Sequence, residues 1–132
     1  DVIPRIAMLS FSNFGSTQHP QSLKVAKATA MVKNLRPDLM VDGEMQADTA
    51  VVAERLEQDF PFSILKGGAN VLIFPSLEAG NIAYKLLQRL TDATVIGPIL
   101  MGMRKPVHVI QRGDTVQDII NMSAIAVVDA NK

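Results

Sequence analysis

Residues 71–76 have the sequence VLIFPS, an apolar run that ends in proline and serine. A short run of β-branched and large apolar residues bounded in this way predicts a buried strand. Ser76 can cap a helix over residues 77–90. That helix carries one apolar stripe that we expect to be buried, formed by Ile82, Leu86 and Leu90. The stretch therefore predicts a strand that leads directly into an amphipathic helix, which is half of a parallel βαβ unit.

The same alternation of strand and helix patterns continues on both sides of this stretch. We expect strands at residues 5–10, 39–41, 93–96 and 107–110 and helices at residues 23–36, 47–58 and 115–128. Ser22 is the expected N-cap of the first helix, and Asp114 with Gln117 is the expected capping box of the last. Residues 42–43, Asp-Gly, indicate a turn, and residues 60–70 are irregular. The pattern predicts the α/β class, with a mainly parallel sheet flanked by helices.

The composition is that of a globular protein and excludes several classes of function. The 132 residues are 48% hydrophobic, with 13 Lys and Arg against 13 Asp and Glu, and they include no cysteine. Balanced charge argues against a general nucleic-acid binder or a polybasic membrane module, and the lack of cysteine excludes disulfides and thiolate metal sites. No apolar run is long enough for a membrane span. We expect a cytoplasmic protein with no nucleic-acid or membrane partner and, because Asp1 is not an initiator methionine, one cut from a longer polypeptide.

A candidate anion site lies at the predicted strand-to-helix junction of residues 105–114, KPVHVIQRGD. Arg112 presents a planar guanidinium that can hold a phosphate or carboxylate at two points, beside a helix N-terminus. An ion pair with Asp114 or Asp118 is the alternative role for this arginine. Gln111 precedes it, and no serine, cysteine or other nucleophile is adjacent, which favours binding over reaction.

A second candidate site is the polar loop after the first predicted strand. Its small and polar residues are Ser12, Asn13, Gly15, Ser16 and Thr17. Such a loop can cradle phosphate oxygens through its backbone N–H groups. An ordinary polar surface loop is the alternative, and Phe14 either contacts a ligand or packs the loop down.

The helix predicted over residues 77–90 carries further candidates. Gly80 and Asn81 lie early in this helix, where glycine is unfavourable and indicates the close approach of another backbone. Lys85 and Arg89 can meet the phosphates of a ligand, or they belong to a solvated helix face.

Other polar residues have structural interpretations. Asp42 and Glu44 are interpreted as turn residues, because no acid partner or metal-ligand set accompanies them. His108 is interpreted as a packed, hydrogen-bonded histidine in the middle of a strand. Neither His19 nor His108 has metal-ligand spacing to another donor, so no metal site is predicted.

Five segments occur in an order that identifies a family. They are SFSNFGS at residues 10–16, DGEMQ at 42–46, the strand and helix at 69–90, IGPI at 96–99 and Arg-Gly at 112–113. Together they resemble the C-terminal part of the phosphate acetyltransferase (phosphotransacetylase) family, over essentially the whole chain. The segment VHVIQRG at residues 107–113 is most similar to the transacetylase-like C-terminal domain of large bacterial NADP-dependent malic enzymes.

This resemblance implies roles for four residues. Arg112 and Asp118 match the family's arginine and nearby aspartate, so Asp118 is expected to orient Arg112. Arg89 matches an arginine implicated in CoA binding. Gln111 occupies the position of a serine that helps to activate the CoA thiol, and glutamine is neither an acid nor a base near neutral pH. The resemblance thus implies ligand binding without turnover.

The resemblance also implies an architecture and partners. The family fold has two lobes, with residues 1–104 in the second lobe and residues 105–132 returning to the first. A homo-oligomer, a dimer or higher, is expected, with acetyl-CoA as the ligand and no cofactor in this segment. In the parent, a malic-enzyme domain would use NADP and a divalent metal to convert malate to pyruvate. The alternative functions are an active phosphate acetyltransferase and a domain that only builds the oligomer.

Overall fold

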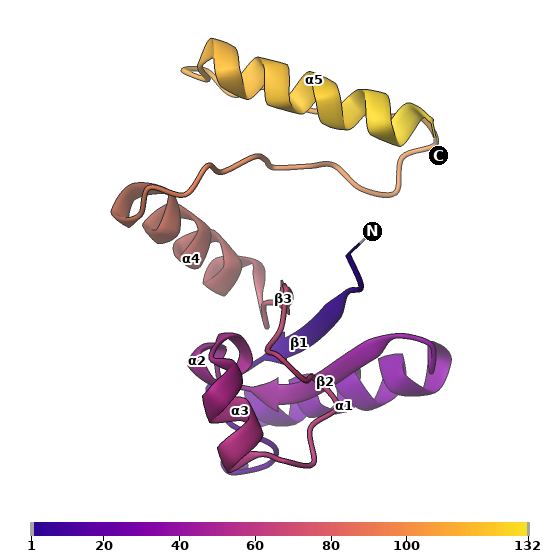
Figure 1. Ribbon diagram of the computed structural model, residues 1–132, viewed down its shortest axis with the longest axis vertical. Coiled ribbons are helices and arrows are strands. Elements are labelled where there is room, and N and C mark those ends of the chain that lie inside the picture. The colour runs from indigo at the N-terminus through magenta and orange to yellow at the C-terminus, as the bar shows by residue number, and fades with distance from the viewer. Residues whose placement is uncertain (1, 132) are drawn as a thin grey trace. The chain divides into compact units, whose positions relative to one another are not determined.

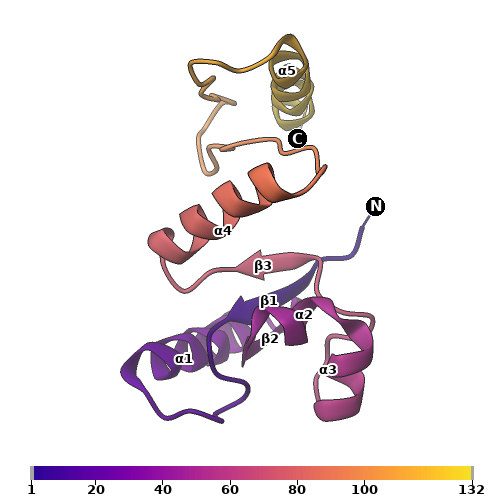
Figure 2. The same ribbon diagram turned by 90° about the vertical axis from the view of Figure 1, so that its left-hand side faces the viewer.

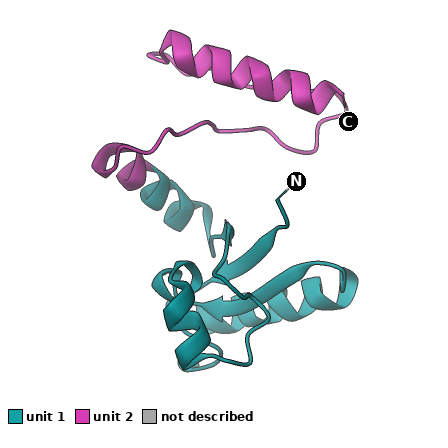
Figure 3. Cartoon of the chain, in the orientation of Figure 1, with its two compact units in different colours: residues 1–84 teal, residues 85–132 magenta. Residues whose placement is uncertain are grey.

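The computed structural model describes residues 2–131 and confirms the α/β class (Figure 1). The elements in chain order are β1 (Arg5–Leu9), α1 (Pro20–Leu35), β2 (Met40–Met45), α2 (Ala47–Val51), α3 (Ala53–Asp59), β3 (Val71–Ile73), α4 (Leu77–Leu90) and α5 (Val116–Ala130). The chain forms two compact units that divide between Tyr84 and Lys85, within α4 (Figure 3). The lobe boundary expected at residues 104–105 concerns the family's lobes and stays a prediction.

The first unit contains a parallel sheet with the strand order β2-β1-β3. Successive residues of β1 point to opposite faces, as a strand requires. Ala7 and Leu9 pack with Met45 and Leu56 on the face covered by α2 and α3, whereas Met8 packs with Val25 and Val41 on the face covered by α1. Figure 2 shows α1 and the α2–α3 pair on opposite sides of the sheet. Both faces of the central strand are therefore buried, which explains its apolar sequence.

Strand β2 is longer than the sequence predicts. The expected turn at residues 42–43 is wrong, because the strand continues through them to Met45. Gly43 has a φ of +135°, and a Cβ atom there would lie 2.6 Å from the carbonyl oxygen of Met8. The glycine therefore allows β2 to pass close to β1. A register shift follows, since Met8 pairs with Gly43 and Leu9 with Met45, which leaves Glu44 as the extra residue of a bulge.

Two helices of the first unit differ in their bounds or caps from the sequence prediction. Helix α1 starts at Pro20 and is capped by His19, so Ser22 is not the N-cap but the third helical residue, whose hydroxyl accepts from the His19 N–H. Proline at the first helical position is favourable, since its missing N–H would have no partner there. The helix expected over residues 47–58 is divided at Val52 into α2 and α3.

Helix α4 begins and ends as predicted, and Ser76 Oγ accepts from Ala79 N at 3.2 Å. Its apolar stripe, however, is not buried, since Ile82 is 55% exposed and Leu90 is 77% exposed. An amphipathic sequence predicts that a helix has an apolar face. That face becomes buried only when another part of the structure packs against it.

The second unit contains α5 and long irregular segments. The capping box of α5 is Thr115 with Asp118, and the capping box predicted from Asp114 and Gln117 is wrong. The strands predicted at residues 93–96 and 107–110 do not form within the described part of the chain. An apolar run becomes a strand only when a neighbouring strand supplies backbone hydrogen bonds, and these segments have none here.

Candidate functional site

The loop after β1 and the end of β2 form a hydrogen-bonded cluster. We call residues 10–17 the serine loop. Ser12 is fully buried, and its hydroxyl donates to Glu44 Oε1 at 2.9 Å while accepting from Thr17 N at 3.0 Å. Gly15 N also donates to Glu44 Oε1, at 2.6 Å. Asn13 Oδ1 accepts from Gln46 N at 2.7 Å. The structure thus brings together all five loop residues that the sequence singled out, with Ser16 Oγ accepting from Asn13 N.

Backbone N–H groups of residues 12–17 all donate to acceptors within the protein. Beyond the donations already described, Ser16 N donates to Asn13 O and Phe14 N to Glu44 O, at 2.9 and 2.7 Å. In this conformation the loop N–H groups donate to carboxylate, hydroxyl and carbonyl oxygens of the protein, and the phosphate cradle that the sequence suggests stays a prediction. The side chains of Ser16 and Thr17 belong to exposed residues, and their contact with a ligand stays a prediction.

An aromatic cluster packs against the serine loop through Phe14. The Phe14 ring lies 5.0 Å from that of Phe60 and 4.9 Å from that of Phe62, as measured between ring centroids. Phe14 has a φ of +46°, a value that non-glycine residues rarely adopt. Of the two interpretations of Phe14, the structure supports packing of the loop.

Sequence reasoning missed that two carboxylates of β2 are buried, and only one of them, Glu44, bonds to the serine loop. Asp42 is 4% exposed and Glu44 is 3% exposed, so the interpretation of both as turn residues is wrong. Burial opposes ionisation of Asp42, but hydrogen bonds from Lys33, Ser63 and the Ile64 N–H outweigh it and hold the pKa of Asp42 below its usual range. The only sequence signal was the glycine between the two acids, which also fits a turn.

A cavity of about 290 Å³ lies where β1 and β3 end. It is lined by Ser10, Phe11, Gln21, Pro75, Ser76 and Glu78. The first two residues follow β1, Pro75 and Ser76 follow β3, and the other two lie in the first turns of α1 and α4. The chain leaves β1 toward β2 on one side, while β3 pairs on the other side, so the cavity lies at the point where strand order reverses. Open parallel sheets bind ligands at such a switch point, at the carboxyl ends of the strands.

Helix α4 carries the four candidate residues predicted from the sequence, Gly80, Asn81, Lys85 and Arg89. A Cβ atom on Gly80 would lie 3.5 Å from the Phe74 side chain, an ordinary van der Waals contact, and the nearest atoms belong to that side chain, so the expected close approach of another backbone is wrong. Asn81, Lys85 and Arg89 are exposed. Their contact with phosphate groups stays a prediction.

The Arg112 junction belongs to the second unit. Gln111 N donates to Asp114 Oδ2 at 2.7 Å, and Asp114 N donates back to Gln111 O at 3.1 Å, which closes a turn before α5. Arg112 is exposed at this turn and, within residues 2–131, forms no ion pair with Asp114 or Asp118. Its side chain is therefore available to an anion.

Asp118 has a different role from the one expected. Its carboxylate accepts from Thr115 N at 2.8 Å and from Thr115 Oγ1 at 2.7 Å. The Thr115 hydroxyl and N–H lower the pKa of Asp118. Asp118 thus caps α5 and does not orient Arg112 in this structure.

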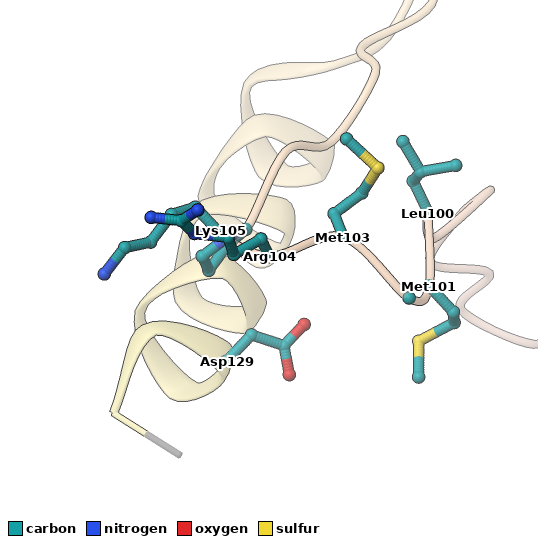
Figure 4. Close-up of a pocket in the computed structure, with 8 residues that line it drawn as sticks. Leu100, Met101, Met103, Arg104, Lys105 and Asp129 are labelled. Carbon is teal, nitrogen blue, oxygen red and sulfur yellow. The ribbon is translucent and has the colours of Figure 1, made fainter.

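A second cavity, of about 220 Å³, lies beside the C-terminal end of α5 (Figure 4). The segment from Leu100 to Pro106 lines it together with Asp129. His108 lies nearby with its side chain 4% exposed and Nε2 3.6 Å from the Asp129 carboxylate. Both ring nitrogens lack a hydrogen-bond partner in the described residues, so the expected hydrogen-bonded histidine is packed but not hydrogen-bonded.

Neither a metal centre nor a membrane span appears in residues 2–131. No three His, Cys, Asp or Glu side chains in that range are grouped so that they could hold a metal ion. None of its helices has the length and apolar character needed to cross a bilayer.

Comparison with known proteins gives relatives of two kinds. The chain is 52% identical over 127 residues to a phosphate acetyltransferase of Thermoanaerobacterium thermosaccharolyticum. The matched segment covers 96% of this chain and 39% of the relative. It is 46% identical over 128 residues to an NADP-dependent malic enzyme of Escherichia coli, covering 96% of this chain and 17% of the relative. The chain therefore spans about two fifths of the first relative and about a sixth of the second.

Solved structures and the family match agree with these relatives. A phosphotransacetylase from Streptococcus pyogenes matches with a TM-score of 0.91 and 45% identity, over 98% of this chain and 40% of that one. The match to the phosphate acetyl/butaryl transferase family covers residues 1–127. With a parallel sheet, a polar loop at its carboxyl edge and relatives at this level of identity, the chain belongs to the phosphate acetyl/butaryl transferase family.

Proposed function

We propose that this chain is a transacetylase-like domain that binds acetyl-CoA without turning it over. The observation that carries the proposal is Gln111, directly before the exposed Arg112. The family resemblance places a serine there, and an amide cannot transfer the proton that a CoA thiol must lose. The guanidinium of Arg112 keeps the ability to hold phosphate or carboxylate oxygens. The domain thus keeps the guanidinium for ligand binding but lacks the serine hydroxyl for acetyl transfer.

The same proposal assigns the domain to the C-terminal end of a cytoplasmic malic enzyme. The malic-enzyme domain of that parent would bind NADP and a divalent metal and convert malate to pyruvate, while this domain regulates the activity and builds a homo-oligomer. Regulation requires only that acetyl-CoA bind one arrangement of the oligomer more tightly than another, by about 1–3 kcal/mol. The similarity to NADP-dependent malic enzymes supports this assignment.

An active phosphate acetyltransferase is the second candidate, favoured by the name of the relative at 52% identity. Such an enzyme moves an acetyl group between phosphate and the sulfur of CoA. Arg112 would then stabilise charge on the transferring group, and another residue would have to replace the missing serine.

The deciding experiment uses the full-length protein that carries this chain. Acetyl-CoA and inorganic phosphate are supplied, and acetyl phosphate and free CoA thiol are measured. We expect acetyl-CoA to bind in calorimetry without acetyl phosphate forming above background. Gln111→Ser is the matched gain-of-function variant, and Arg112→Ala should weaken acetyl-CoA binding and relieve its effect on malate oxidation.

The other outcomes identify the other functions. Formation of acetyl phosphate by the unaltered protein would establish the transferase. A protein that binds no acetyl-CoA, with malate oxidation unaffected by Arg112→Ala, would have a domain that serves the oligomer alone.

A further inference from the structure

We infer that Glu44 is a positioning residue that holds the serine loop in its ligand-binding shape. The inference rests on the proposed function, because it concerns the loop beside the cavity at the carboxyl ends of β1 and β3. Glu44 itself is 3% exposed and does not need to touch a ligand. It acts through the loop residues that hydrogen-bond to it.

The contacts of Glu44 join parts of the chain that are far apart in sequence. A single oxygen, Oε1, accepts from Ser12 Oγ at 2.9 Å and from Gly15 N at 2.6 Å. The backbone oxygen of Glu44 accepts from Phe14 N at 2.7 Å. Ser12 in turn accepts from Thr17 N at 3.0 Å. One buried carboxylate thus organises the loop from Ser12 to Thr17.

The residues after Glu44 fasten the remaining part of the loop. Met45 O accepts from Ser10 N at 2.8 Å, and Gln46 Nε2 donates to Phe11 O at 2.7 Å. Ser10 and Phe11 line the cavity at the end of β1. The end of β2 therefore determines both the loop conformation and one wall of the cavity.

The bulge in β2 explains why a carboxylate reaches the loop. Leu9 pairs with Met45 and Met8 with Gly43, so Glu44 is the residue that has no partner in the ladder. Bulges redirect side chains and are common beside functional sites. Only glycine at position 43 permits this path, since any Cβ atom would lie 2.6 Å from the Met8 carbonyl oxygen.

Holding a loop in one conformation affects ligand affinity directly. When only a fraction of molecules has the binding conformation, the apparent dissociation constant increases by the reciprocal of that fraction. Loss of the Glu44 contacts should therefore weaken binding even though no group that touches the ligand is changed.

The test compares three variants of the full-length protein. Glu44→Ala removes both hydrogen bonds to Oε1. Glu44→Gln retains a carbonyl oxygen that can accept both, so it is the rescue variant. Asp42→Ala is the matched control, because it truncates an equally buried carboxyl that bonds to Lys33, Ser63 and Ile64 and not to the loop. Amide hydrogen exchange of residues 12–17, calorimetric binding of acetyl-CoA and the melting temperature are measured for each.

We expect Glu44→Ala to speed exchange in residues 12–17 and to weaken acetyl-CoA binding by about tenfold, the equivalent of one charge-assisted hydrogen bond. Glu44→Gln should recover most of both properties. Asp42→Ala should lower the melting temperature but leave loop exchange and affinity at the wild-type level.

Unchanged loop exchange in Glu44→Ala, or an equal loss of affinity in Asp42→Ala, would overturn the inference. If the unaltered protein binds no acetyl-CoA, the proposed function fails, and loop exchange by itself then decides whether Glu44 holds the loop.

Discussion

Replacing Asp42 by alanine tests the buried network that joins α1, β2 and the loop before β3. The carboxylate accepts from Lys33 Nζ at 2.6 Å, from Ser63 Oγ at 2.8 Å and from Ile64 N at 3.1 Å. Ser63 is 2% exposed, so its hydroxyl cannot turn to bulk water when its acceptor is removed. The variant therefore leaves donors without partners in a region that is otherwise packed.

The magnitude follows from these contacts. A buried donor without an acceptor costs about 1–3 kcal/mol, and this applies in full to Ser63 Oγ and in part to Ile64 N, because Ile64 is 46% exposed. The side chain of Lys33 is 43% exposed, so its pair with Asp42 adds at most about 1 kcal/mol. We expect Asp42→Ala to lower the free energy of unfolding by about 3 kcal/mol in urea denaturation followed by circular dichroism at pH 7.

Asp38→Ala is the matched control, because that carboxylate is exposed and pairs with Arg36 at the surface. The control should leave the free energy of unfolding unchanged within error. A value for Asp42→Ala no larger than that of the control would refute the reasoning.

The difference in unfolding free energy between wild type and Asp42→Ala should depend on pH in a definite direction. Since the pKa of Asp42 is lower in the folded protein than in the unfolded chain, the unfolded state binds more protons between the two values. The contribution of Asp42 is therefore complete above the ordinary aspartate pKa of about 3.9 and is lost as the pH falls through the folded value. The difference in unfolding free energy between wild type and Asp42→Ala should be constant from about pH 8 to 6 and shrink below about pH 4. A difference that grows in acid would contradict this account.

Two further substitutions test the sheet and the core. Gly43→Ala places a Cβ atom 2.6 Å from the Met8 carbonyl oxygen at a φ of +135°, and should cost at least about 3 kcal/mol or prevent folding. Gly67→Ala, with a φ of +74° and no atom within 4 Å, should cost only about 1–2 kcal/mol, so equal melting temperatures for the two would be inconsistent with a steric cause. Leu56→Ala, at 1% exposure, should cost about 2–5 kcal/mol in urea denaturation, whereas Leu35→Ala, at 72% exposure, should change the stability by less than about 0.5 kcal/mol.

Local signals predicted the elements that depend on local chemistry. The strand at residues 71–73 and the helix at 77–90 form where the apolar run, Pro75 and Ser76 indicate. A cap, a proline or an apolar period acts within a few residues, so the sequence alone carries that information. The serine loop was selected for the same reason, because its small and polar residues are adjacent in the chain.

Long-range contacts were the part that sequence reasoning could not supply. Asp-Gly at residues 42–43 has a turn composition, yet the pairing of β2 with β1 makes it part of a strand. Glu44 contacts Ser12 and Gly15, which lie about thirty positions earlier, and no local pattern marks that relation.

The amino-acid sequence by itself determined the α/β class, the family and the order of strands and helices in the first unit. Only the tertiary structure decided that Glu44 is buried under the serine loop and that the apolar runs at residues 93–96 and 107–110 remain irregular. The physical reason is that a strand and a buried carboxylate both need partners. Hydrogen-bond donors and acceptors from distant segments determine whether each one forms.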